Sequence, residues 1–202
     1  MATATYGPNM DSQLETAYDG DGGTSNLSSV GIVTGKSPYK IRTAMGFDLS
    51  ALAGATITLA TMTITNNNVD VSTPPGCHAY RITESAWVES SSWSYYDYGS
   101  TLSWATPGGD YTTTDGVAFT PDGTADASWD ITGLDVLVQD AIDNRSGQLL
   151  LLLKADSESG SLNTSRPFFT REGTYPPSLY IEYTTAAVPL RPTLVGLSPG
   201  VF

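Results

Sequence analysis

The sequence predicts an all-β chain, folded as a two-sheet antiparallel jelly-roll β-sandwich with one short helix and an extended C-terminal arm. Short β-branched and alternating segments recur between turn signals such as Pro74-Pro75-Gly76 and Pro107-Gly108-Gly109. One segment has the 3.6-residue apolar period of a helix. The 202 residues suffice for one domain with a good core. We therefore divide the chain into an N-terminal segment (1–9), the sandwich (10–184) and the arm (185–202).

Residues 55–64 predict a half-buried strand, because apolar and polar side chains alternate along them. The alternation slips by one residue at Leu59-Ala60. One extra residue in a strand lets both halves keep the same face toward the core, so the slip predicts a bulge or bend. The inward candidates are Ile57, Leu59 and Ile64.

Two later segments predict further strands. Residues 149–153 are five consecutive leucines, too few for an independent helix, which favours a fully buried central strand. Residues 179–183 alternate again, and we expect them to be the last strand of the sandwich.

Residues 130–142 predict the one helix, a short plug across one end of the sandwich. Either Asp130 or Thr132 can serve as its N-cap, and Asp135 lies in the first turn, where the helix dipole favours a carboxylate. The apolar face of this helix consists of Leu134, Leu137, Val138 and Ala141.

The charge of the chain excludes two classes of partner. A net charge of -12 repels the phosphates of nucleic acids and of anionic membrane surfaces. The sequence has no apolar stretch near the ~20 residues that a membrane helix requires. Its first residues have neither the basic region nor the apolar run of a signal peptide. We therefore expect no nucleic-acid partner and no membrane contact.

The sequence offers no complete catalytic group, so we predict that the chain is not an enzyme. Cys77 and His78 are the single cysteine and histidine. Neighbouring strand residues point to opposite faces, which argues against both a zinc pair and a Cys–His nucleophile. Glu84 and Glu89 are the nearest pair of glutamates, but a glycosidase needs two carboxylates across a cleft, and these two have no supporting neighbours.

Residues 81–111 are the most informative stretch, because they hold three of the four tryptophans and four of the 11 tyrosines. A segment rich in flat rings and poor in reactive groups suits binding and packing better than chemistry. We interpret Trp87 and Trp104 as core residues, since tryptophans are heavily buried on average, with stacking on sugar rings as the alternative. The candidates for contact with a glycan or with another copy of the chain are Tyr95, Tyr96, Tyr98 and Trp93.

Two acidic positions lie in turns. Asp19 and Asp21, spaced one residue apart among glycines, resemble a Ca²⁺ loop, although the twelfth position is Val30 instead of Glu. The alternative is a simple acidic turn without a metal. Both interpretations are kept, so a structural Ca²⁺ is one of two expectations, and no other cofactor is predicted. Asp110 is predicted to brace a turn.

The final segment differs from the rest because Pro189, Pro192 and Pro199 interrupt an otherwise apolar run. Disordered tails are usually poor in such apolar residues. We therefore expect an arm that docks on this domain or on a neighbouring subunit through Leu190, Leu194, Leu197 and Phe202.

Four blocks resemble, in the right order, the DNRLRE-type jelly-roll domains related to carbohydrate-binding modules of bacterial surface and polysaccharide-degrading proteins. They are residues 47–64, 80–111, 127–153 and 168–184. The second is similar to the pattern "W-x-E, T/S-W, W-x-x-P-G-G-D", and the last to "S/T-R-E … P-x-L-x-I-x-Y". The resemblance implies a non-catalytic β-sandwich in which Arg171-Glu172 is a conformational brace.

The chain departs from that family, since it starts at its own Met1, has no export signal and ends in an arm foreign to the family. We therefore expect a non-enzymatic virion structural protein of a bacteriophage, such as a capsid decoration, spike or tail-associated protein. Its partners are other virion proteins or copies of itself, and its loops touch host glycans. The alternative is a carbohydrate-binding module of a secreted or cell-surface bacterial protein.

Overall fold

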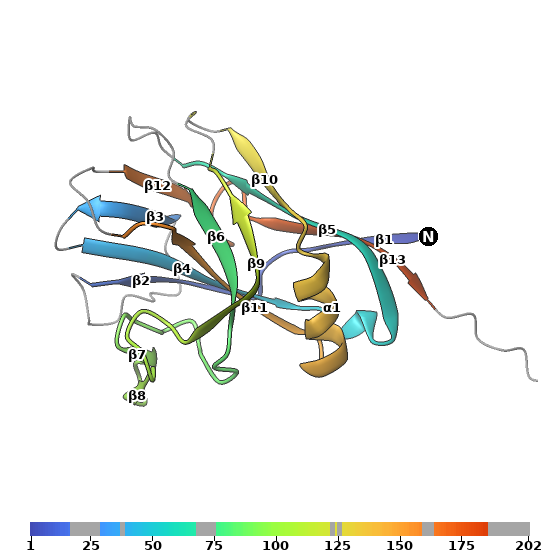
Figure 1. The fold of residues 1–202 in the computed structure, drawn as a ribbon, viewed down its shortest axis with the longest axis horizontal. Helices are drawn as coiled ribbons and strands as arrows, with labels where there is room; N and C mark the ends of the chain where they lie inside the picture. Colours follow the sequence, from blue (N-terminus) through green and yellow to red (C-terminus); the bar gives the residue numbers. More distant parts are fainter. Residues whose placement is uncertain are drawn as a thin grey trace, which may run out of the picture.

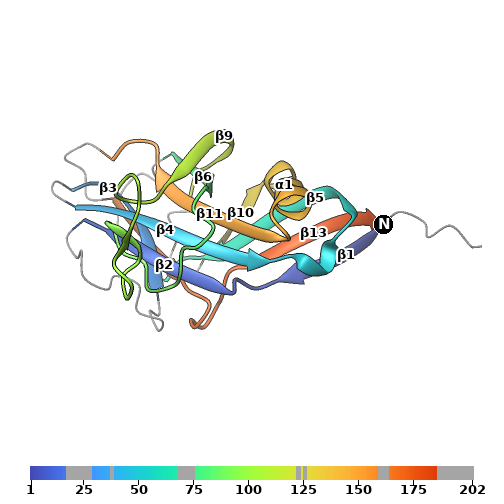
Figure 2. The ribbon, with the colours of Figure 1, turned by 90° about the horizontal axis from the view of Figure 1, so that it is seen from below.

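The chain folds into two antiparallel β-sheets packed as a sandwich (Figure 1 and Figure 2). This arrangement confirms the predicted fold class. From residue 186 onward, the predicted arm lies outside the described residues, as do Asp19 and Asp21. The computed structural model describes residues 1–16, 29–36, 39–67, 76–121, 124, 127–158 and 164–185.

The first sheet has four strands, and the N-terminal segment belongs to it. Ala2 lies opposite Tyr183, and Tyr6 lies opposite Leu179. The sandwich therefore begins at residue 2, although the sequence placed residues 1–9 outside it. This edge strand pairs with its neighbour through backbone hydrogen bonds, and its side chains are exposed except for the half-buried Ala4 and Tyr6. The strand order is β1 (Ala2–Tyr6), β13 (Ser178–Thr185), β5 (Ala55–Thr65) and β10 (Ser128–Thr132).

The second sheet has seven strands. Its order is β12 (Thr164–Phe169), β3 (Ser29–Lys36), β4 (Tyr39–Asp48), β11 (Gln148–Ala155), β6 (Cys77–Ile82) and β9 (Tyr111–Phe119), with β2 (Met10–Glu15) also paired to β4. From β4 to β5 to β6, and again from β9 to β10 to β11, the chain crosses between the sheets. The orders β1-β13-β5-β10 and β4-β11-β6-β9 are those of a jelly roll.

β5 contains the predicted bulge. Glu182 pairs with Leu59 and Tyr183 pairs with Ile57, so Thr58 is the extra residue. Ile64 is fully buried, as predicted, and Ile57 packs against the core. The prediction for Leu59 was wrong, because this side chain is 37% exposed. The bulge lies one residue earlier than the apolar pattern suggested, and the inward residues that follow it are Ala60, Met62 and Ile64.

β11 is buried on both faces, which explains its run of leucines. Leu149, Leu151 and Leu153 lie in the main core between the two sheets. Leu150 and Leu152 point the other way, into a second apolar cluster on the outer face of the seven-stranded sheet. The prediction of a fully buried central strand is confirmed, since β11 lies between β4 and β6.

The helix α1 (Asp135–Asn144) packs across one end of the sandwich, beside the short helix η1 (Ser50–Leu52) (Figure 1). Its predicted N-caps were wrong, because Asp130 and Thr132 belong to β10. Gly133, with φ +85°, turns the chain out of the strand, so the helix begins later. The predicted apolar face is confirmed by the burial of Leu134, Leu137, Val138 and Ala141.

The two-sided burial of β11 gives a direct prediction. Leu152→Ala should lower the free energy of unfolding by about 2–5 kcal/mol, because it leaves a cavity in the second apolar cluster. Leu151→Ala, which empties a site in the main core, should have an effect of the same size. Urea denaturation of both variants measures the two losses. A loss within about 0.5 kcal/mol for Leu152→Ala alone would mean that the outer face of β11 is exposed in solution.

Candidate functional site

The tryptophan-rich loop, residues 83–110 between β6 and β9, covers the outer face of the seven-stranded sheet. Trp87 and Trp104 are 2% and 4% exposed, which confirms them as core residues. The indole Nε1 of Trp104 donates a hydrogen bond to the carbonyl oxygen of Ser92 at 2.9 Å. The loop therefore closes a second apolar cluster, made of Leu14, Ala44, Ile82, Trp87, Trp104, Leu150 and Leu152.

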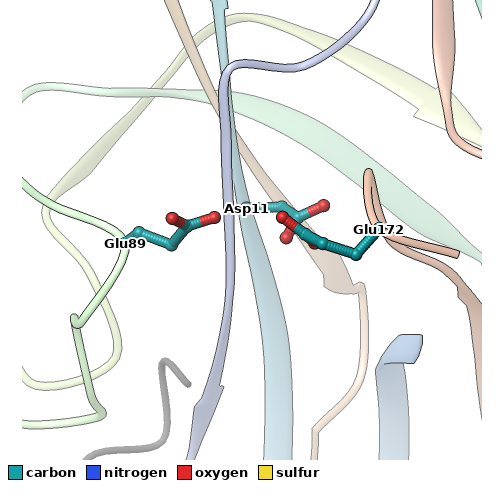
Figure 3. A group of neighbouring side chains, drawn as sticks. All are labelled: Asp11, Glu89 and Glu172. Carbon is teal, nitrogen blue, oxygen red and sulfur yellow. The ribbon is translucent and has the colours of Figure 1, made fainter. Parts of the chain in front are cut away.

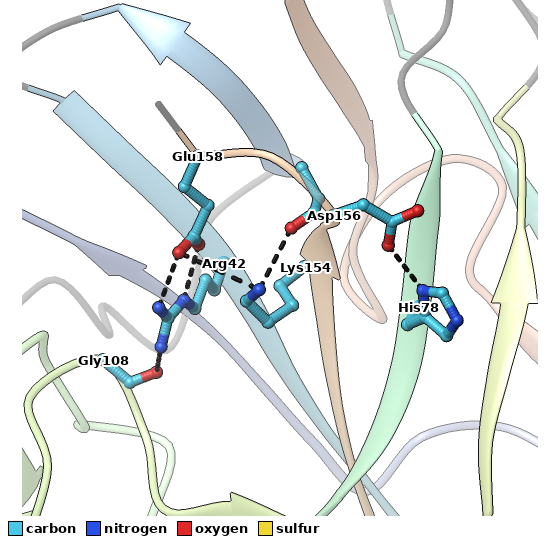
Figure 4. A network of polar contacts seen from close by, with 7 residues as sticks. Arg42, His78, Gly108, Lys154, Asp156 and Glu158 are labelled. Atoms are coloured by element: carbon cyan, nitrogen blue, oxygen red, sulfur yellow. Dashed lines mark hydrogen bonds and ion pairs between the residues drawn. The ribbon is translucent and has the colours of Figure 1, made fainter. Parts of the chain in front are cut away.

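Arg42 on β4 fastens this loop to the sheet (Figure 4). Its Nε and Nη2 donate to the two carboxylate oxygens of Glu158, each at 2.7 Å, and its Nη1 donates to the carbonyl oxygen of Gly108 at 2.7 Å. The guanidinium lies 4.8 Å from the centre of the Trp93 ring. A side chain at Gly108 would meet both Trp93 and Arg42 at 2.7 Å, so this contact requires glycine.

The stack of rings continues from Arg42 along the sheet. Tyr111 lies 5.7 Å from the guanidinium, Tyr80 stacks on Tyr111 at 5.1 Å, and His78 stacks on Tyr80 at 5.3 Å. His78 Nδ1 is hydrogen-bonded to Asp156 Oδ1 (Figure 4). Burial, followed by the charge of Asp156, raises the pKa of Tyr80. Tyr80 is stacked on both His78 and Tyr111, so its ring belongs to the packing of this column.

Cys77 and His78 point to opposite faces, as predicted from their position on a strand. Cys77 is buried in the main core, whereas His78 lies on the outer face.

An open cleft of about 710 Å³ lies where the loop meets the beginning of β9. Asp110 shapes its wall, because its two carboxylate oxygens accept hydrogen bonds from the backbone N–H groups of Ala105 and Thr106, each at 2.7 Å. The predicted turn brace is thereby confirmed. Glu84 Oε1 accepts a hydrogen bond from Ala86 N at 2.8 Å. The lining residues are Thr83, Glu84, Ala105, Thr106, Gly109, Asp110, Tyr111, Thr112 and Thr113.

The four aromatic residues predicted to contact a glycan do not share one surface. Trp93 lies on Arg42, and Tyr96 packs edge-on against Trp104 at 5.9 Å, so both belong to the packing of the loop. Tyr95 and Tyr98 meet each other at 5.8 Å on the hairpin of β7 (Tyr95–Asp97) and β8 (Leu102–Ser103), at the lower left of Figure 1. Contact with a glycan or a partner through Tyr95 and the 36% exposed Tyr98 stays a prediction.

A charged cluster that the residue patterns did not predict lies on the other side of the loop (Figure 3). Carboxylate oxygens of Asp11, Glu89 and Glu172 lie within 4.8 Å of one another. Arg171 forms ion pairs with both Glu89 and Glu172. Glu89 therefore belongs to this ion-paired cluster, whereas Glu84 lines the cleft. The family resemblance had indicated only that Arg171-Glu172 forms a brace.

Comparisons with protein-family models and with curated proteins find no match for this chain. Among the described residues, no helix has the length and apolar character that crossing a membrane would require. The function is therefore inferred from the residues of the cleft and of the loop around it.

The role of Arg42 can be tested with Arg42→Lys, which keeps the charge but loses the planar fork and the ring stack. We expect the free energy of unfolding to fall by about 2–4 kcal/mol, because two charge-assisted hydrogen bonds are lost in a buried site. The matched control is Arg145→Lys, since Arg145 pairs with Asp140 on the surface and should lose less than about 1 kcal/mol. Equal losses in the two variants would contradict a special role for Arg42.

Proposed function

We propose that the chain is a non-enzymatic recognition module whose cleft binds a neutral saccharide. The observation that carries this proposal is a carboxylate, Glu84, in an open cleft whose other polar side chains are mostly hydroxyls. Sugar hydroxyl groups donate and accept hydrogen bonds at once, and threonine hydroxyls can match them in both roles. A carboxylate accepts from two neighbouring sugar hydroxyls and forms stronger hydrogen bonds than a neutral acceptor does.

The charge of the cleft favours a neutral ligand. Glu84 and Asp110 both line it, and its described lining contains no lysine or arginine. The chain as a whole carries a net charge of -12. An anionic polysaccharide would meet repulsion both on approach and in the site. Uncharged sugars avoid that repulsion and can still use the carboxylate as an acceptor.

The cleft does not have the arrangement that hydrolysis of a sugar needs. A glycosidase uses two carboxyl groups that are free to act on opposite sides of the bond. In Asp110, instead, one carboxylate oxygen accepts a hydrogen bond from Ala105 N and the other accepts one from Thr106 N. These two bonds hold the wall of the cleft in place. Glu84 uses Oε1 on Ala86 N, so its Oε2 is the carboxylate oxygen left for a ligand, which supports binding without catalysis.

Saccharide binding can be measured by calorimetry and on an array of neutral oligosaccharides. Glu84→Gln should weaken binding by roughly tenfold or more, because one charge-assisted hydrogen bond is lost. Glu182→Gln, a matched change on the four-stranded sheet, should leave the affinity unchanged. Loss of binding in Tyr98→Ala but not in Glu84→Gln would move the site to the β7–β8 hairpin. Failure of the unmodified chain to bind any neutral glycan would reject the proposal.

A second candidate is a structural role on a bacteriophage particle, with the virion surface as its location and other virion proteins or further copies as its partners. The apolar, proline-interrupted sequence of residues 185–202 favours it. Burial of Leu190, Leu194, Leu197 and Phe202 at ~25 cal/mol per Å² would supply several kcal/mol before ordering costs. Recognition of host glycans by the cleft is compatible with this role. A secreted or cell-surface module would use the cleft in the same way.

Removal of residues 186–202 tests the assembly role. We expect the full chain to be an oligomer and the truncated chain to be a monomer with an intact sandwich, because β13 ends at Thr185. Light scattering gives the two masses, and circular dichroism checks that the strands persist. Equal masses for both forms would contradict self-assembly through this segment.

A further inference from the structure

Three separate chain segments meet at one group of charged side chains. They are β2, the 83–110 loop and the 170–177 turn between β12 and β13, which contribute Asp11, Glu89 and the pair Arg171 and Glu172 (Figure 3). Asp11 and Arg171 are 160 positions apart in the sequence. The group therefore fastens the tryptophan-rich loop to the body of the sandwich.

Arg171 makes most of the bonds in this group. Its backbone N–H donates to Asp11 Oδ2 at 2.7 Å, and its Nη2 donates to Glu89 Oε2 at 2.8 Å. Its Nη1 donates to the carbonyl oxygen of Asn9 at 3.1 Å, and its Nε lies 2.8 Å from Glu89 Oε1. The side chain of Arg171 thus reaches both the loop and the residue before β2, while its backbone N–H bonds to β2 itself.

The charges of the group do not balance. Asp11 is only 5% exposed, and the charged groups that face it are Glu89 from the loop and Arg171 and Glu172 from the turn. The β4 residue opposite Asp11 is the uncharged Met45. One guanidinium therefore serves three carboxylates, and an ionised carboxylate at a buried position raises the free energy of the closed arrangement.

We propose that Asp11, Glu89, Arg171 and Glu172 form a latch that holds the 83–110 loop on the sheet, and that this latch closes more tightly in weakly acidic than in weakly basic solution. The proposal concerns the loop alone and is independent of what the cleft binds. A proton on one oxygen of Asp11 removes a buried charge, while the other oxygen still accepts the Arg171 N–H.

The direction of the pH effect follows from the two states of the loop. Burial raises the pKa of Asp11 from 3.8 to about 6, against the lowering effect of the hydrogen bond from Arg171 N and with further increases from Glu172 and Glu89. In the open state Asp11 is solvated, and its pKa returns toward 3.8. The closed latch thus binds a proton more tightly than the open one. Its equilibrium constant for opening should rise on the order of tenfold between about pH 5 and pH 7.5.

Hydrogen exchange of the full chain measures this opening. The amide of Arg171 reports on the latch, because it donates to Asp11 Oδ2 and the side chain of the same residue holds Glu89 of the loop. Amides of β11 serve as the internal reference, since they lie in the centre of the sheet. After correction for the intrinsic pH dependence of exchange, the Arg171 amide should open about tenfold more at pH 7.5 than at pH 5, and at both pH values it should open more readily than the β11 amides, which exchange on global unfolding.

Asp11→Asn should abolish this rise, because the amide is neutral at both pH values. The matched control is Asp130→Asn on β10 of the other sheet, which should keep the rise. If Asp11→Asn does not fold, Glu172→Gln replaces it, since loss of one repelling charge must shrink the rise. No rise in the unmodified chain, or a full rise in the folded variant tested, would overturn the proposal.

Discussion

The buried guanidinium of Arg42 is the interaction on which the outer half of the molecule depends. It lies 8% exposed on β4 and joins elements that are far apart in the sequence, since Glu158 follows β11 and Gly108 belongs to the tryptophan-rich loop. Trp93 covers one side of it and Tyr111 approaches from the column of rings. Residues that line the cleft flank Gly108 on both sides, so the bond from Arg42 to Gly108 fixes this part of the cleft wall. An ammonium group could not provide the same planar set of bonds.

Burial on both faces of the seven-stranded sheet explains why the loop is so aromatic. One face packs against the four-stranded sheet, and the other exposes Leu14, Leu150 and Leu152 unless something covers them. A long loop with little regular structure covers such a surface best with a few large rings, because each ring buries much area at a small entropic cost. The tryptophans are therefore committed to packing. The binding that we propose uses instead the polar rim of the loop, where hydroxyls and carboxylates line the cleft.

Local patterns in the sequence predicted local features well. The run of leucines, the bulge near Leu59 and the apolar face of α1 each follow from the period of neighbouring residues. Features that depend on distant partners were not predicted. β1 is recognised only through its pairing with β13, and Asp11 meets Arg171 across 160 positions. The four aromatic residues predicted to contact a glycan or a partner show the same limit. Trp93 and Tyr96 pack against the second apolar cluster, whereas Tyr95 and Tyr98 do not, and composition alone does not reveal which rings will pack in this way.

Two groups of charged side chains hold the loop, one around Arg42 and one around Arg171, and their net charges have opposite signs. At the first, Arg42 and the nearby Lys154 share Glu158, so two cations face one carboxylate. At the second, Arg171 alone faces three carboxylates, so the contact is strained when all are ionised. The loop is thus held by one contact with an excess of cations and one with an excess of carboxylates, and the proposed response to pH belongs to the second. The proton on Asp11 then adjusts how firmly the loop is held, while the apolar core between the two sheets contains no part of this charged group.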